Sequence, residues 1–165
     1  MNTYLQRLKN AIELAVQGMS ESDLTRRPSE GKWSPAEILE HLCLTYKVTT
    51  KNLERSLTAG RPLGGPRTLK QRLVNVLVLD LAYFPAGRDS PQGAKPKGLL
   101  VSGEVYRKLA DMNDVIQDCE IKFGKPAFVA DHPILGPLTT HQWRKFHWVH
   151  GRHHVKQILR IRKIG

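Results

Sequence analysis

The amino-acid sequence predicts an all-α protein, a bundle of four long helices with one extra short helix and a long crossing rich in proline and glycine. Three observations favour this class. Apolar residues recur at helical intervals over four long stretches, helix-start signals precede three of them, and no stretch is a convincing strand. The length of 165 residues fits one domain, so we expect a single domain spanning residues 1–165.

The first long helix is expected at residues 3–17, where one stripe is apolar and Gly18 follows as a stop. The next segment, residues 20–32, is polar and contains Pro28 and Gly31. It predicts a loop, with a turn of helix around residues 22–25.

The second long helix is expected from Pro35 to Gly60. Ser34 can cap it, Pro35 suits the first helical position, and Glu37 completes a capping box. His41 lies on the edge of the inner face and therefore points partly inward. That face consists of Ile38, Leu39, Leu42, Tyr46, Thr49, Leu53 and Leu57.

The middle of the chain predicts a short helix between two irregular segments. Residues 61–67 hold two prolines and two glycines and should form a loop. A helix from Thr68 to about Ala82 is favoured by its length, although its valines alternate as in a strand. Residues 84–98 hold three prolines and three glycines. We expect them to cross irregularly, wrapping the outside or lining a site.

The last two long helices are expected at residues 103–123 and 140–160. Ser102 can cap the first of them, and the Gly124–Pro126 segment ends it. Residues 127–138 should form a loop, and Thr139-Thr-His-Gln142 is a second capping box. The inner side of the final helix carries Trp143, Phe146, His150, His154, Gln157 and Ile161.

The composition indicates a soluble globular protein, with 40% hydrophobic and 25% charged residues. Two cysteines make no disulfide framework, no signal peptide is evident, and no apolar run could span a bilayer. We therefore expect a cytoplasmic location and no membrane partner. The net charge of +11 is spread along the chain without a basic block, which argues against nucleic acid as a partner. Steering of small anionic substrates is another use for this charge.

Histidines are concentrated near the C-terminus: His147, His150, His153 and His154 are four of the chain's seven. His150 and His154 lie one helical turn apart on the same side, so their ring nitrogens can share an ion. We expect the third ligand to be His41. The pair His150 and His153 is a competing assignment, and His147 could extend the cluster. The inward stripe favours His154. A simpler interpretation is that these rings are buried and bond to backbone carbonyls, with no metal.

Three neutral imidazoles with an open fourth position suit a divalent ion such as zinc, nickel or iron(II). Such ligands add no negative charge, so the ion keeps its full Lewis acidity. A water or thiol bound to it would lose a proton near neutral pH.

Other chemistry-bearing residues have structural interpretations of similar or greater weight. For Trp33 and Trp143, a role in the core or in a hydrophobic staple at a helix start is favoured over one in a substrate pocket. Cys43 lies about 200° around the helix from His41 and is a poor fourth ligand. Glu37 can orient His41 or serve only in its capping box. His132 and His141 flank the site in sequence, where surface or loop roles are favoured over acid–base roles.

Two motifs resemble those of the DinB-like (YfiT-like) superfamily. The first is Gly31-Lys-Trp33-Ser-Pro-Ala-Glu37-Ile-Leu-Glu-His41-Leu. The second starts at His132-Pro-Ile-Leu-Gly136-Pro and continues through Trp143, Phe146, His150, His153-His154 and Gln157-Ile158. The resemblance spans essentially the whole chain. It implies a four-helix bundle of up-down-down-up connectivity with metal ligands at His41, His150 and His154.

The resemblance also implies a range of activities. Characterised relatives include transferases and isomerases that use mycothiol, bacillithiol or glutathione, and relatives often associate in pairs. We therefore expect a metal-dependent, thiol-using transferase or isomerase that acts on a small electrophilic substrate, and we expect it to form a homodimer. Two alternatives stay open: a metal-dependent hydrolase that uses bound hydroxide, and a non-catalytic basic bundle that binds nucleic acid.

Overall fold

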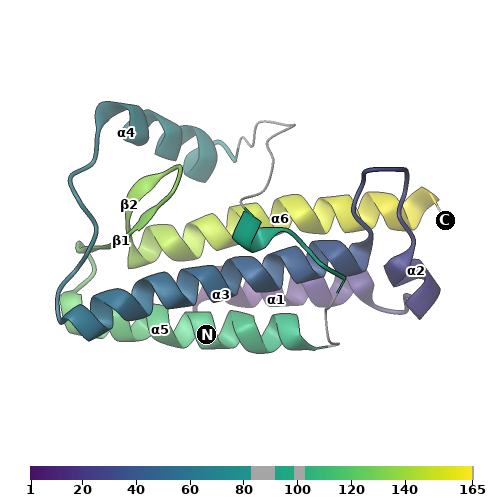
Figure 1. Cartoon of the computed structure of the whole chain (residues 1–165), viewed down its shortest axis with the longest axis horizontal. Coiled ribbons are helices and arrows are strands. Elements are labelled where there is room, and N and C mark those ends of the chain that lie inside the picture. The colour runs from purple at the N-terminus through teal and green to yellow at the C-terminus, as the bar shows by residue number, and fades with distance from the viewer. Residues whose placement is uncertain (83–91, 99–102, 165) are drawn as a thin grey trace.

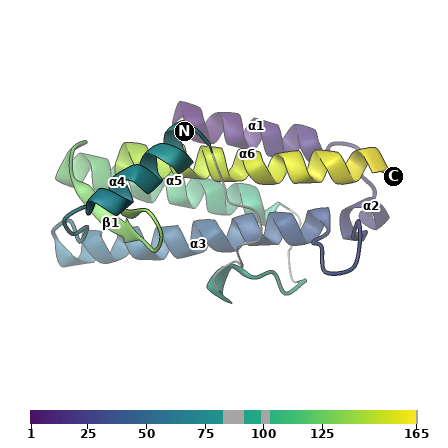
Figure 2. The same cartoon turned by 90° about the horizontal axis from the view of Figure 1, so that it is seen from above.

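The computed structural model describes residues 1–82, 92–98 and 103–164. The structure is mostly helical, as predicted. Four long helices lie side by side along the longest axis (Figures 1 and 2): α1 (Thr3–Val16), α3 (Pro35–Ala59), α5 (Glu104–Phe123) and α6 (Thr140–Ile164). The last helix continues beyond its predicted end at residue 160. Among the described residues, no helix is both long and apolar enough to cross a membrane.

Contacts near the helix ends show how the helices are directed. Lys122, near the end of α5, donates to the carbonyl of Leu57 near the end of α3, at 2.9 Å. Arg162, near the end of α6, donates to the carbonyl of Leu14 near the end of α1, at 3.4 Å. Therefore α3 runs parallel to α5, and α1 runs parallel to α6.

Capping boxes fix the start of the two helices that carry the clustered histidines. At α3, the Ser34 hydroxyl accepts from the amide of Glu37 (3.2 Å), and the Glu37 carboxylate accepts from the amide of Ser34 (2.8 Å). Thr139 and Gln142 make the same pair of bonds at α6. Both boxes satisfy backbone donors that a helix start would leave unpaired.

The core lies between the four long helices and continues under the strands described below. Its largest fully buried side chains are Trp143, Tyr46, Leu5, Leu8, Ile12, Ile38, Leu42, Leu53, Leu109, Met112, Ile116 and Leu135. Cys43 and Cys119 are buried too, as small apolar side chains.

The short helical elements largely follow the predictions. Helix α2 (Glu21–Thr25) is the turn expected near residue 22, and α4 (Leu69–Asn75) continues as the π-helical turn η1 (Val76–Asp80). The predicted crossing contains the 3₁₀ turn η2 (Gln92–Ala94), while its first part, up to residue 91, lies outside the described residues. The predicted cap Ser102 lies outside them too, and Gly103, with φ of 80°, occupies the N-cap position of α5.

The prediction of a loop at residues 127–138, with no strand in the chain, is wrong. Strands β1 (Phe128–His132) and β2 (Gly136–Thr139) form an antiparallel hairpin. A register shift between Phe128 and Ala130 interrupts the alternation expected of a strand, and prolines lie inside the segment. The His132 ring closes the turn, because its Nδ1 accepts from the amides of residues 134 and 135 at 3.1 Å each.

Candidate metal centre

The antiparallel packing of α3 against α6 brings together the three histidines predicted as ligands. His41 lies in the second turn of α3, and His150 and His154 lie one turn apart near the middle of α6. The Nε2 atom of His150 lies 3.3 Å from that of His41 and 3.1 Å from that of His154. All three candidate ligand atoms lie within 4.8 Å of one another.

The spacing of these nitrogens fits a metal ion. Nitrogen ligands about 2.0–2.1 Å from a tetrahedral zinc ion lie roughly 3.3–3.4 Å from each other. The separations of 3.3 and 3.1 Å are close to that spacing. His41 and His154 are buried and His150 is half-buried, so an ion here would be largely shielded from solvent.

Acceptor oxygens behind two of the rings select the tautomer that a metal needs. The carbonyl of Ala94 lies 2.7 Å from Nδ1 of His41, and Oε1 of Gln157 lies 2.7 Å from Nδ1 of His154. Each oxygen requires a hydrogen on Nδ1, which leaves the Nε2 lone pair facing the other histidines. Both lone pairs point at Nε2 of His150, which carries at most one hydrogen and so cannot donate to both. A bound cation would accept the lone pairs of all three Nε2 atoms.

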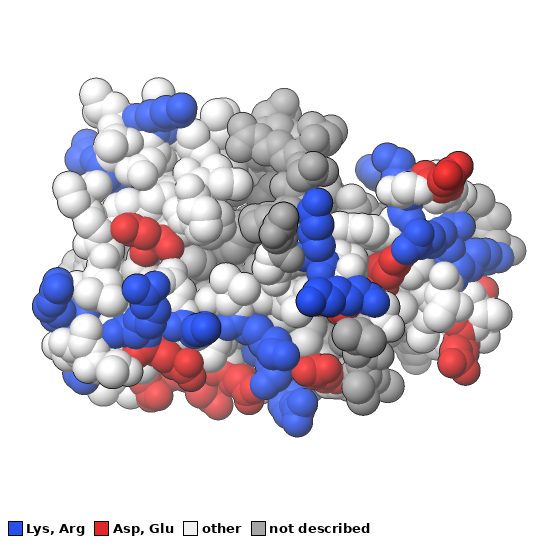
Figure 3. Space-filling view, viewed as in Figure 1, with Lys and Arg blue, Asp and Glu red and all other residues white. Residues whose placement is uncertain are grey.

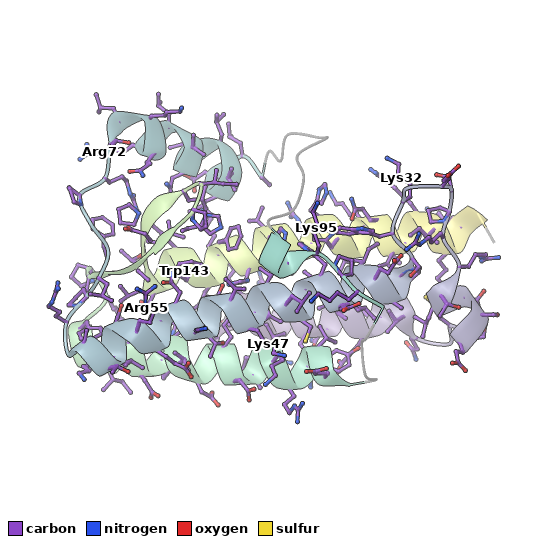
Figure 4. The ribbon with its side chains drawn as sticks, in the orientation of Figure 1. Lys32, Lys47, Arg55, Arg72, Lys95 and Trp143 are labelled. Carbon is purple, nitrogen blue, oxygen red and sulfur yellow. The ribbon has the colours of Figure 1, made fainter. Side chains whose placement is uncertain are left out.

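Residues 92–98, the described part of the predicted crossing, are held against α3 beside the triad. The buried carboxylate of Glu40 accepts from the amides of Lys97 (2.9 Å) and Gly98 (2.7 Å). These bonds hold the carbonyl of Ala94 against His41, and Lys95 marks the segment in Figure 4. The crossing was expected either to wrap the outside of the protein or to line a site, and residues 92–98 lie at the site. Nothing in the sequence pointed to Ala94, because it contacts His41 through its backbone oxygen and not through its side chain.

Aromatic rings cover the triad on two sides. The Trp33 ring lies 5.0 Å from that of His41 and 6.5 Å from that of His154. The Phe146 ring stacks on His150 at 5.4 Å. Trp33 therefore lines the site as well as packing on the core, whereas Trp143 is a core residue on the N-terminal half of α6 (Figure 4).

Burial keeps the three imidazoles neutral. It lowers the pKa of His41 and lowers that of His154 to about 3. The pKa of His150 lies well below its ordinary value, first because of burial and then because of its histidine neighbours. The rings therefore do not have to release protons to bind a metal near neutral pH.

The remaining histidines have separate surroundings. His147 is fully buried, with Nε2 3.1 Å from the Thr49 hydroxyl. His153 is exposed and accepts from the Gln157 amide at 3.2 Å, so the pair with His150 is not the one that converges. His141 is exposed.

Two other candidates from the sequence serve the fold. The carboxylate of Glu37 bonds the Ser34 amide and the Arg27 guanidinium, and the oxygen behind His41 comes from the crossing. Among the described residues, the converging group consists of the three histidines and does not include Cys43. Burial raises the pKa of the Cys43 thiol.

Three neutral histidines converge between antiparallel helices of a mostly helical protein. This arrangement places the protein in the class of helical proteins that could hold a metal ion between their helices. The family model of the DinB superfamily matches residues 4–158, and the chain belongs to this superfamily. An uncharacterised protein, YuaE of Bacillus subtilis (strain 168), is 24% identical over 159 residues, covering 90% of this chain and 88% of that protein. No solved structure gives a significant match.

Proposed function

We propose that this protein is a divalent-metal-binding member of the DinB superfamily and a thiol-using transferase or isomerase that acts on a small electrophile. The observation that carries the metal site is the convergence of three Nε2 atoms at 3.1 and 3.3 Å. The two pairs of parallel helices support a bundle of up-down-down-up connectivity within one domain.

Each residue around the triad has a defined task in this proposal. His41, His150 and His154 hold the ion, while Ala94 and Gln157 keep two rings oriented through their Nδ1 hydrogens. Trp33 and Phe146 limit the access of water. A zinc, nickel or iron(II) ion bound by these neutral ligands would supply Lewis acidity and lower the pKa of a thiol held beside it.

The surface charge gives less support to nucleic-acid binding. Figure 3 shows Lys and Arg side by side with Asp and Glu over α3 and α5. The exposed charged residues of these two helices include Lys47, Lys51, Arg55, Asp114 and Asp118. Such mixed charge does not form the continuous basic surface that a phosphate backbone requires.

Metal analysis of the untagged protein, purified without chelators, tests the site. We expect about one divalent ion per chain, as a three-histidine site implies. His150→Ala should remove the ion, whereas His153→Ala, which changes a neighbouring exposed histidine, should retain it. A wild-type protein without metal, or an unchanged metal content in His150→Ala, would overturn the proposal.

A thermal-shift comparison of metal-loaded and metal-free protein then tests the thiol. A low-molecular-weight thiol that binds through the ion should raise the melting temperature of the loaded protein alone. If the metal-loaded protein shows no shift with any thiol but hydrolyses small ester or amide substrates, the transferase assignment is wrong and the protein is a hydrolase.

A further inference from the structure

A cavity lies between the α4–η1 segment and the start of α6, and none of the three clustered histidines lines it. Its volume is about 370 Å³, in the range of small-molecule pockets. It is lined by Arg67, Arg72, Asn75, Val76, Leu79, Asp80, His141, Gln142 and Lys145, here called the basic pocket.

The basic pocket has an excess of positive charge. Lys145 forms an ion pair with Asp80, the one acidic residue among the described residues that line the cavity. Within the described part of the chain, Arg67 and Arg72 form no ion pair with an acidic side chain. Arg72 is exposed on α4 (Figure 4), so the cavity is lined by two guanidinium charges that have no acidic partner among the residues the structure describes.

Hydrogen bonds and a ring contact hold Arg67 at the wall of the basic pocket. One guanidinium nitrogen donates to the carbonyl of Pro137 and to Oε1 of Gln142, and the group lies 4.6 Å from the centre of the Phe128 ring. Its Nε is buried and has no hydrogen-bond partner among the described residues. Burial and repulsion from Arg72 lower the pKa of Arg67. An anion in the cavity would relieve that repulsion.

We propose that the basic pocket binds the oxyanion group, carboxylate or phosphate, of a small molecule. Guanidinium groups present planar N–H donors that match the paired oxygens of these anions. The site is independent of the metal centre, because Lys145 and His150 are five residues apart on α6 and therefore about 140° apart around it.

Calorimetric titration of the full-length, metal-free protein with inorganic phosphate and with citrate, at constant ionic strength, tests the proposal. Binding of either anion is expected, and the preferred one identifies the group. Arg72→Ala should weaken binding about tenfold or more, since it removes charge-assisted hydrogen bonds. Arg67→Lys should also weaken it, because the charge stays while the planar donors are lost.

Two further variants separate a built site from general attraction to a basic protein. Asp80→Asn removes the acidic side chain that pairs with Lys145 at the cavity, so it should tighten binding several-fold. Arg55→Ala removes the same charge as Arg72→Ala from the exposed face of α3, outside the cavity, and should leave binding unchanged (Figure 4). Absence of binding, equal losses in Arg55→Ala and Arg72→Ala, or no gain in Asp80→Asn would overturn the proposal.

Discussion

The histidine triad and the basic pocket are both built partly on α6, yet their electrostatics are opposite. His150 and His154 are kept neutral by burial and offer lone pairs, whereas Lys145 joins two arginines whose charges persist. The difference follows from side-chain chemistry. A buried imidazole can lose its proton, but a guanidinium keeps its charge wherever it lies. One helix can therefore serve a cation on one side and an anion on another.

The largest expected effect separates the two sites directly. A zinc concentration a thousandfold above Kd should add about 4 kcal/mol to the free energy of unfolding of the wild type. This gain should vanish in His150→Ala and persist in Arg72→Ala. Chemical denaturation with and without zinc measures all three proteins, and a gain that survives His150→Ala would show that zinc binds elsewhere.

Removing the oxygen that bonds to Nδ1 of His154 should weaken metal binding by the triad without abolishing it. Gln157→Leu should lower metal affinity about 10- to 100-fold, because Nδ1 of His154 loses the acceptor that orients its ring. Gln157→Glu keeps an acceptor and should retain or raise affinity. Titration against a chromophoric chelator measures the affinities, and ¹⁵N NMR reports the His154 tautomer. Equal losses in both variants would indicate that Gln157 only packs.

The triad could be predicted from the sequence because its geometry is mostly local. His150 and His154 share a helix face, and the Ser34 capping box fixes where His41 lies on α3. Spacing alone left His153 and His147 open as alternatives. The resemblance to the DinB superfamily, which the family match confirms, pointed to His41 and His154.

The basic pocket and the contact of Ala94 with His41 could not be predicted because they depend on tertiary contacts. Arg67, Arg72 and Lys145 come together only when the α4–η1 segment packs near the start of α6. The Ala94 carbonyl reaches His41 only because Glu40 fastens residues that have no regular pattern. The hairpin was missed for a related reason, since its register shift hides the alternation of a strand.

Acid should destabilise the histidine region while the arginine charges stay constant. Burial lowers the pKa of His147 to about 3, whereas unfolding returns it to about 6.5. The unfolded chain therefore binds more protons between these values, and stability falls as pH drops through that window. Between pH 7 and pH 5, protonation of His147 in the unfolded chain should lower the free energy of unfolding by about 2 kcal/mol. Urea unfolding of wild type and His147→Asn at both pH values measures it, and parallel losses would assign the effect to other groups.

The smallest effect concerns the capping box that positions His41. Ser34→Ala removes the oxygen that accepts from the Glu37 amide and should cost about 1 kcal/mol of stability. Ser20→Ala is a matched control, because Ser20 makes the same capping box at α2, a helix with no buried residues. It should cost less, since little of the fold depends on α2. Metal content and anion binding should stay unchanged in both variants. Loss of metal from Ser34→Ala alone would mean that the start of α3, and not the packing of α3 against α6, holds His41 in place.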